Sequence, residues 1–171
     1  GWNVLDTCSA PGGKTTHMAE IMGNFGRIDA LDASEIRLRL VDEASARLGI
    51  SCIHTMPYDC TYLDEEKDIL LSEYDLVLCD VPCSGLGLLH RKPDIRLSMN
   101  YENMPELIPI QRIILENSCL RVRKGGTLMY STCTIDPLEN EEQIACFLED
   151  HPEFEAQPFD DMLPDEMREN P

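Results

Sequence analysis

The sequence contains no pair of cysteines spaced as Cys-x-x-Cys, although cysteine itself is abundant. Eight cysteines occur among 171 residues, and the lack of such pairs argues against a zinc ribbon or knuckle. Four of them, Cys52, Cys79, Cys119 and Cys146, lie within apolar segments, where a free thiol behaves as a small hydrophobic side chain. We therefore expect these four to be buried and no metal to be bound.

Long apolar runs and an excess of basic residues are also missing. No run approaches the ~20 residues that a membrane-spanning helix requires, and no segment resembles a signal peptide. We therefore expect a cytoplasmic protein without a membrane partner. The formal net charge is −18, from 32 acidic and 14 basic residues. Because phosphate contacts depend on lysine and arginine, this balance argues against a chain that binds nucleic acid unaided.

The acidic residues are concentrated toward the C-terminal end. Thirteen acids and one base lie from Asp136 onward, whereas residues 1–135 carry 19 acids and 13 bases. The sequence also begins without methionine, directly on an apparent strand. We therefore expect a fragment of a longer protein, in which residues 1–150 form a core, residues 151–171 form an acidic tail, and a basic partner domain lies outside.

Short apolar segments alternate with amphipathic stretches along the chain. Five segments are too continuously apolar for half-exposed strands, which predicts buried parallel strands at residues 3–7, 27–31, 51–56, 74–79 and 127–132. Such alternation predicts an α/β fold with a Rossmann-like, doubly wound and mainly parallel sheet.

Helices are predicted in the intervals between these strands. Apolar spacing indicates helices around residues 18–22, 38–48, part of 62–71, and 107–114. Gly49 is the expected C-cap of the second helix, and Gly125-Gly126 is expected to separate the fourth helix from the last strand. A fifth helix is predicted to start at Asp136 as N-cap, with Pro137 at its first position and Glu139 completing a capping box.

Most of the unusual residues come directly after a predicted strand. Ligands of parallel sheets bind beyond the carboxyl ends of the strands. The segments found there are residues 8–14, 32–34, 58–60, 80–87 and 131–135. We therefore expect these five segments to share one edge of the sheet.

The first of them, within "DTCSAPGGKTT" at residues 6–16, resembles the end of a phosphate-binding loop. A Walker A loop needs glycine five residues before its last glycine, where this chain has Cys8. The turn can still let its backbone approach a ligand, and Asp32, about 20 residues further on, suits a ribose. Asp59 is placed to accept hydrogen bonds from an adenine. Together they indicate an adenosine-containing cofactor, although "YDLVLCD" imitates Walker B and keeps an ATPase as an alternative.

Four stretches carry a family resemblance. "VLDTCSAPGGKTTH", "DVPCSG", "RKPDIR" and "KGGTLMYSTCTIDPLENE" occur in this order over nearly the whole chain. Together they resemble the Sun (Fmu) type of S-adenosylmethionine-dependent RNA cytosine-5 methyltransferases, especially the bacterial branch that modifies small-subunit ribosomal RNA. The resemblance implies a class I methyltransferase fold, of which the last strands are missing here, and an RNA-binding extension outside this chain.

The resemblance also implies roles for individual residues. Asp32 and Asp59 would bind the ribose and adenine of S-adenosylmethionine, Asp80 would belong to the cofactor and target-base pocket, and Cys133 would be the nucleophile. The methionine part of the cofactor would be held by backbone groups of Cys8, Ser9, Ala10, Pro11, Gly12, Gly13 and Lys14. Cys83 would assist product release.

The chemistry of cytosine explains why a cysteine is needed. Carbon 5 is a poor nucleophile, so a thiolate must first add to carbon 6 and push electron density onto carbon 5. DNA cytosine-5 methyltransferases would favour Cys83, and the RNA enzymes favour Cys133, which is our prediction. Asp80 is placed to supply an acid or hydrogen-bond donor to the ring nitrogen. Lys14 could hydrogen-bond the cytosine or cap a turn.

Two further matters stay open in the sequence. The loop from His90 to Arg96 carries three positive side chains and could approach an RNA backbone, although a solvated loop is nearly as good an explanation. A noncatalytic methyltransferase-like binding module is the main alternative function, and a P-loop ATPase comes after it.

Overall fold

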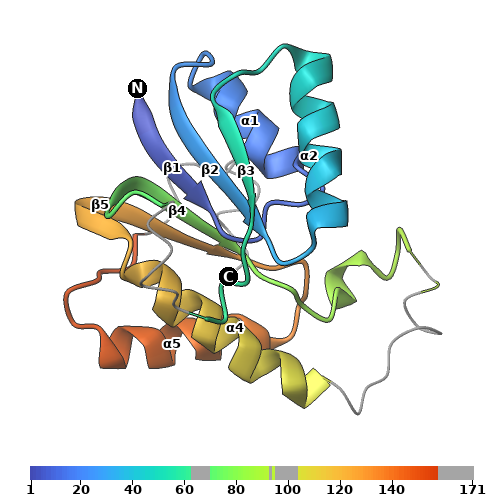
Figure 1. Ribbon diagram of the computed structural model, residues 1–171. Coiled ribbons are helices and arrows are strands. Elements are labelled where there is room, and N and C mark those ends of the chain that lie inside the picture. Colours follow the sequence, from blue (N-terminus) through green and yellow to red (C-terminus); the bar gives the residue numbers. More distant parts are fainter. Residues whose placement is uncertain (63–69, 93, 95–103, 158–171) are drawn as a thin grey trace, which may run out of the picture.

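The computed structural model describes residues 1–62, 70–92, 94 and 104–157 of the chain. Strands and helices alternate along it (Figure 1). In chain order they are β1 (Trp2–Asp6), α1 (Gly13–Ile21), β2 (Gly26–Asp32), α2 (Glu35–Leu48), β3 (Ile53–Pro57), β4 (Tyr74–Asp80), the 3-10 turn η1 (Leu86–Leu88), α4 (Met104–Cys119), β5 (Val122–Ser131), the 3-10 turn η3 (Pro137–Glu139) and α5 (Glu141–Asp150).

The five strands form one parallel sheet in the order β3-β2-β1-β4-β5. The chain runs outward from β1 to β3 and then returns to the other side of β1 to form β4. This change of direction makes the carboxyl ends of β1 and β4 the topological switch point, where ligands of such sheets bind. The predicted α/β, doubly wound and parallel fold is therefore confirmed.

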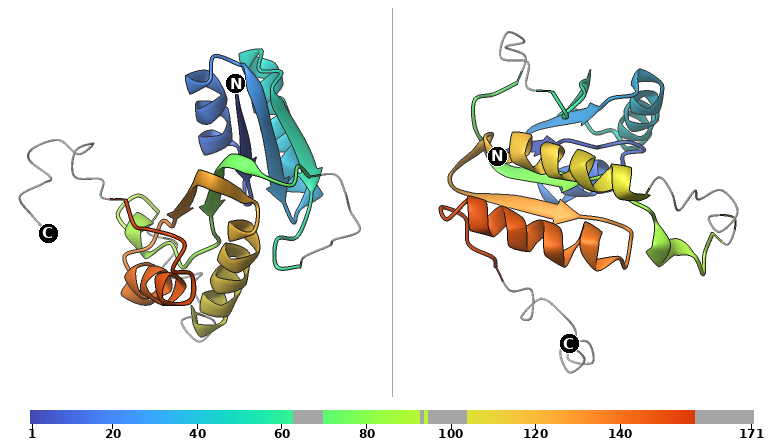
Figure 2. Two further views of the ribbon diagram at one scale, coloured as in Figure 1. Left: turned by 90° about the vertical axis from the view of Figure 1, so that its left-hand side faces the viewer. Right: turned by 90° about the horizontal axis from the view of Figure 1, so that it is seen from below.

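Helices cover both faces of the sheet, with α1 and α2 on one face and α4 and α5 on the other (Figures 1 and 2). Neighbouring strand residues point to opposite faces, so Val4 packs with the α1 side and Leu5 with the α4 side, each only 1% exposed. Burial on both faces explains why the strands are apolar without alternation.

The start of β5 differs from the prediction. Gly125 and Gly126 lie inside the strand instead of ahead of it. The pairing with β4 shifts register between Tyr74 and Leu76, which face Val122 and Thr127. Gly125 has a φ of +72°, so the glycines allow an irregularity within a strand that sequence reasoning took for a break.

The start of the last helix also differs. Asp136 caps the η3 turn by accepting a hydrogen bond from the Leu138 amide at 3.0 Å, and α5 begins only at Glu141. Glu139 does not complete a capping box, because its buried carboxylate binds the Ser84 amide and the side chain of Gln111 instead. The capping signal was real, but it belongs to a shorter turn.

The cysteine expectations were right for three of four residues. Cys52, Cys79 and Cys119 are buried, whereas Cys146 is exposed on α5. The third predicted helix falls mainly on residues 63–69, and most of the expected acidic tail falls on 158–171; both lie outside the described residues. Gly49 is the C-cap of α2, as predicted.

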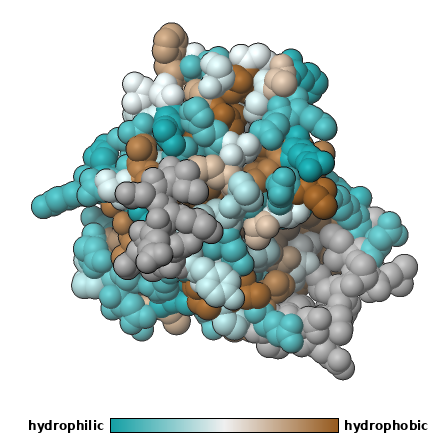
Figure 3. Space-filling view, in the orientation of Figure 1, coloured by the Kyte–Doolittle hydropathy of each residue, from teal (hydrophilic) through white to brown (hydrophobic). Residues whose placement is uncertain are grey.

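Hydrophilic side chains cover most of the face seen in Figure 3, and hydrophobic ones are exposed there in separate patches. Among the described residues, none of the helices is both long enough and apolar enough to cross a membrane.

Candidate active site

The loop after β1 folds back against the end of β2. The Ser9 amide donates to the Leu31 carbonyl at 2.7 Å, and the Gly12 amide donates to the Ser9 carbonyl at 2.7 Å. Gly12 has a φ of +104°, and a Cβ there would lie 3.2 Å from the Cα of Val41. Such a turn keeps side chains away and brings backbone groups and the start of α1 to the ligand-binding edge.

Lys14 and Asp80 connect this loop to the end of β4. The Lys14 ammonium donates to Asp80 Oδ2 at 2.6 Å, and the Ser131 hydroxyl donates to Asp80 Oδ1 at 2.6 Å. Asp80 and Ser131 are also paired in the sheet. The Lys14 and Asp80 side chains are 55% and 31% exposed, so both can reach a ligand.

Cys83 and Cys133 meet just beyond the ends of β4 and β5. Their sulfur atoms are 3.0 Å apart, and the Cys133 amide lies 3.1 Å from the Cys83 sulfur. Burial, with a smaller contribution from the neighbouring thiol, raises the pKa of Cys83 to about 11. Cys133 is exposed and Cys83 is half-buried, so neither is a fully buried structural thiol.

Asp32 ends β2 and is only 4% exposed. Its carboxylate accepts a hydrogen bond from the Ser34 amide at 2.9 Å and pairs with Arg37 at 3.1 Å. Arg37 also donates to the Ala10 carbonyl at 2.6 Å. Sequence reasoning missed Arg37, which links Asp32 to the first loop; its position three residues after the Ser34 N-cap was the available signal.

Asp59 lies next along the same edge, after β3. It is exposed, and its carboxylate accepts hydrogen bonds from the amide and hydroxyl of Thr61 at 2.9 and 2.7 Å. The preceding amide, of Tyr58, donates to the Asp32 carbonyl at 3.1 Å. The turn at Asp59 is therefore anchored beside Asp32, as the strand order predicts.

Thr15 decides against a phosphate-binding loop. In a Walker A motif this hydroxyl reaches a bound Mg²⁺, but here Thr15 is 0% exposed and donates to Asp6 Oδ2 at 2.7 Å. Lys14 is occupied by Asp80. The Gly-Lys-Thr sequence therefore fixes the start of α1 onto β1.

The turn that carries Cys133 is held by a residue that sequence reasoning missed. Asn140 accepts a hydrogen bond from the Thr132 hydroxyl at 2.6 Å and donates to the Thr134 carbonyl at 3.2 Å. Both neighbours of Cys133 are thus fixed by one side chain. The only signal for Asn140 was its place within the motif.

The expected basic loop is described only in part. His90, Arg91 and Lys92 are exposed and follow η1, whereas residues 93, 95 and 96 lie outside the described residues. The exposed part is compatible with either contact to RNA or a solvated loop.

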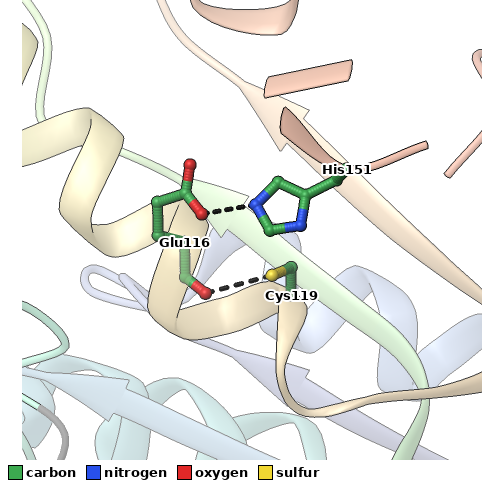
Figure 4. Close-up of side chains that lie close together, drawn as sticks. All are labelled: Glu116, Cys119 and His151. Atoms are coloured by element: carbon green, nitrogen blue, oxygen red, sulfur yellow. Dashed lines mark hydrogen bonds and ion pairs between the residues drawn. The ribbon is translucent and has the colours of Figure 1, made fainter. Parts of the chain in front are cut away.

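Glu116, Cys119 and His151 form a cluster of the side-chain types that bind metals (Figure 4), with candidate ligand atoms all within 4.8 Å. Glu116 lies 2.5 Å from His151 and pairs with Arg112 at 2.8 Å. Burial raises the pKa of the Cys119 thiol to about 11, and that thiol donates to the Glu116 carbonyl at 3.1 Å. Because each group already has a protein partner, we interpret the cluster as a link between α4 and the end of α5.

Comparisons with known proteins agree with this geometry. The family model described as 16S rRNA methyltransferase RsmB/F matches residues 1–169. A protein of Bacillus subtilis strain 168, named probable ribosomal RNA small subunit methyltransferase B, is 41% identical over 96% of this chain and 37% of its own length. A Synechocystis protein of the same name is 44% identical over 92% of this chain and 35% of its own length. The chain thus spans little more than a third of these relatives.

Solved structures show the same fold. NSun6 from Pyrococcus horikoshii, crystallised with SFG, is 32% identical and superposes with a TM-score of 0.76, covering 87% of this chain and 37% of that one. More distant S-adenosylmethionine-dependent methyltransferases share the fold alone. The expected class I methyltransferase type of sheet is therefore confirmed.

Proposed function

The chain belongs to the 16S rRNA methyltransferase RsmB/F family, and from this premise we propose that it transfers a methyl group from S-adenosylmethionine to carbon 5 of cytosine in small-subunit ribosomal RNA. The observation that carries the proposal is the 3.0 Å contact between the sulfurs of Cys83 and Cys133, beside the ion pair of Lys14 and Asp80. Methylation at carbon 5 requires a thiol at the ligand-binding edge. A noncatalytic binding module has no need of one.

The residues along this edge fit S-adenosylmethionine, which supplies the methyl group when it is bound. A Cβ on Gly12 would crowd Val41. With glycine at this position, the turn has backbone groups that can face a ligand directly. Asp32 would accept hydrogen bonds from ribose hydroxyls and Asp59 from the adenine. The methionine part would be held by Cys8, Ser9, Ala10, Pro11, Gly12, Gly13 and Lys14, with Asp80 at the methyl end.

The reaction begins with the addition of the Cys133 sulfur to carbon 6 of the cytosine. Asp80 stabilises the proton at the ring nitrogen of this adduct, and Lys14 hydrogen-bonds the base. Once carbon 5 carries the methyl group, its proton leaves to a base and the carbon–sulfur bond breaks, which restores the Cys133 thiolate. Cys83 assists this release.

The environments of the two thiols support this division of roles. The raised pKa of Cys83, about 11, keeps it protonated at neutral pH, whereas a nucleophile must be a thiolate. Cys133 is also the more exposed of the two, so a flipped base can reach it.

We extend the proposal to the organisation of the protein. Residues 1–150 would form the methyltransferase core, residues 151–171 an acidic tail, and the charge balance of the core would require a basic RNA-binding domain elsewhere in the protein. The reaction would occur in the cytoplasm, where ribosomal RNA is found.

Calorimetry with S-adenosylhomocysteine and with ATP tests the cofactor assignment. The first ligand should bind, Asp32→Asn should weaken it by about tenfold or more, and ATP should not bind. Methylation is tested by mapping 5-methylcytosine in ribosomal RNA from a strain that lacks the gene. Loss of one modified cytosine supports the enzyme; an unchanged map with intact cofactor binding would favour a noncatalytic module.

A further inference from the structure

Glu139 is a carboxylate buried beneath the two cysteine loops, with only 1% of the residue exposed. Its Oε2 atom accepts two hydrogen bonds, from the Ser84 amide at 2.9 Å and from Gln111 Nε2 at 2.8 Å. Gln111 lies on α4 and is 0% exposed. The carboxylate therefore connects the end of η3, the loop after β4 and helix α4.

Gln111 holds the same loop at a second point. Its Nε2 atom also donates to the Pro82 carbonyl at 2.9 Å. The residues on both sides of Cys83 are thus fixed, Pro82 by Gln111 and Ser84 by Glu139. Cys83 itself is left to face Cys133.

The other end of the connection reaches the loop of Cys133. The Tyr130 hydroxyl donates to the Glu139 carbonyl at 2.8 Å, and the Ser84 and Thr134 hydroxyls are 2.7 Å apart. Thr134 directly follows Cys133. Glu139 therefore links the two thiol-bearing segments, through its carboxylate to Ser84 and through its backbone carbonyl to Tyr130.

This arrangement is costly as a purely structural device. Among the described residues, Glu139 Oε1 and Gln111 Oε1 are buried with no hydrogen-bond partner, and leaving such atoms unpaired costs about 1–3 kcal/mol each. Apolar side chains of similar volume would fill the space without that cost. The geometry therefore favours a role in which the hydrogen bonds of Glu139 and Gln111 orient the loops, and not one in which these side chains only fill space.

We propose that Glu139 and Gln111 are positioning residues that hold the Cys83 thiol against the Cys133 thiol; the link to methyl transfer rests on the proposed function. Neither side chain touches the substrate. They act by fixing the backbone on either side of Cys83.

The test is the rate at which the two cysteines can be joined as a disulfide. Diamide takes up the two hydrogen atoms that the thiols lose as the sulfur–sulfur bond forms, and peptide mapping by mass spectrometry identifies the Cys83–Cys133 link. The full-length protein should form it quickly. Gln111→Met, which keeps side-chain volume but removes both donated bonds, should slow it by about tenfold, and so should Glu139→Gln.

Gln143→Met is the matched control. Gln143 is also a buried helical glutamine, and its Nε2 donates to the Ile108 carbonyl at 2.8 Å. Within the described part of the chain its hydrogen bonds join it to Ile108 and Arg112 and not to either cysteine loop, so this variant should cross-link at the original rate. Thermal unfolding identifies variants that fold, and Gln111→Met carries the test if Glu139→Gln does not.

Turnover provides the second readout. Gln111→Met should lower kcat per active site by about tenfold or more with little change in the KM for S-adenosylmethionine, whereas general instability would lower the number of active sites and leave kcat per active site and KM unchanged. Cross-linking of Gln111→Met at the original rate, or equal slowing by Gln143→Met, overturns the positioning role. If the variants change the cross-linking rate as expected but the protein never methylates RNA, the positioning role holds and the proposed function is contradicted.

Discussion

The sulfur atom of Cys83 lies 3.0 Å from that of Cys133, although 50 residues separate them in the sequence. Each follows a strand, and the strands are neighbours with Asp80 opposite Ser131. Parallel pairing therefore delivers both loops to one edge of the sheet. Because the two thiols differ in exposure, we expect their removal to affect the reaction at different steps.

From the proposed mechanism, Cys133→Ala should abolish both turnover and the covalent RNA adduct, because the sulfur proposed to add to carbon 6 is gone. Cys83→Ala should still allow attack but accumulate the adduct, because release is impaired. Denaturing gels of protein mixed with RNA measure this directly. A denaturant-resistant complex formed by Cys133→Ala would reverse the assignment of the two cysteines.

The ion pair of Lys14 and Asp80 should matter for chemistry and little for folding. Asp80→Asn should lower kcat by about 10²–10⁴-fold, the usual contribution of a group that handles a proton. The free energy of unfolding should change by no more than about 1 kcal/mol, because both side chains are partly exposed.

Asp75→Asn is the control for Asp80→Asn. Asp75 is the second residue of the same strand and pairs with Arg123 at 2.7 Å, at the end of β4 opposite to the site. This variant should leave kcat unchanged while altering stability. Equal losses of kcat in both variants would contradict a specific role for Asp80.

Sequence patterns predicted the sheet and its functional edge well. Continuous apolar runs fix buried parallel strands, and parallel strands bring their following loops together, so Asp32, Asp80, Cys83 and Cys133 could be placed in advance. Sequence patterns could not predict which side chains bind these carboxylates. Arg37 on Asp32 and Ser131 on Asp80 depend on side-chain reach after folding.

The local errors have a common cause. Glu139 matched a capping box and Gly125-Gly126 matched a break, but contacts from distant segments decided both. Glu139 is bound by Ser84 and Gln111, and the glycines lie at the register shift of β5 against β4, where a Cβ on Gly126 would come within 3.1 Å of the Asp75 carbonyl. Tertiary contacts overrode the local signals, and the spacing of residues in the sequence does not reveal such contacts.

Gly12→Ala should damage the first loop. A φ of +104° is unfavourable for any residue with a Cβ, and that Cβ would also crowd Val41 at 3.2–3.4 Å. We expect a loss of about 1–3 kcal/mol in the free energy of unfolding together with weaker binding of S-adenosylhomocysteine.

Gly49→Ala is the control for Gly12→Ala, because Gly49 has a φ of +68° with nothing within 4 Å. This variant should lose stability and keep its affinity for S-adenosylhomocysteine. Equal affinities in the two variants would contradict a binding role for the Gly12 turn.

Asp6 should make stability depend on pH. Burial raises its pKa from 3.8 to about 7, so between those values the unfolded chain has lost a proton that the folded chain retains. The free energy of unfolding should therefore fall as pH rises from 4 to 7 and then level off, by about 4 kcal/mol at most. Asp6→Asn keeps an acceptor for Thr15 but cannot ionise. Urea unfolding should therefore show a shallower fall for this variant, which should be more stable than wild type at pH 8.

Asp75 is the control, because its pKa is lowered, mainly by the Asn3 amide, and its effect on stability has the opposite dependence on pH. Asp75→Asn should leave the fall between pH 4 and 7 in place while removing a loss of stability below pH 4. An Asp6→Asn curve parallel to that of wild type would show that Asp6 is already ionised in the folded protein.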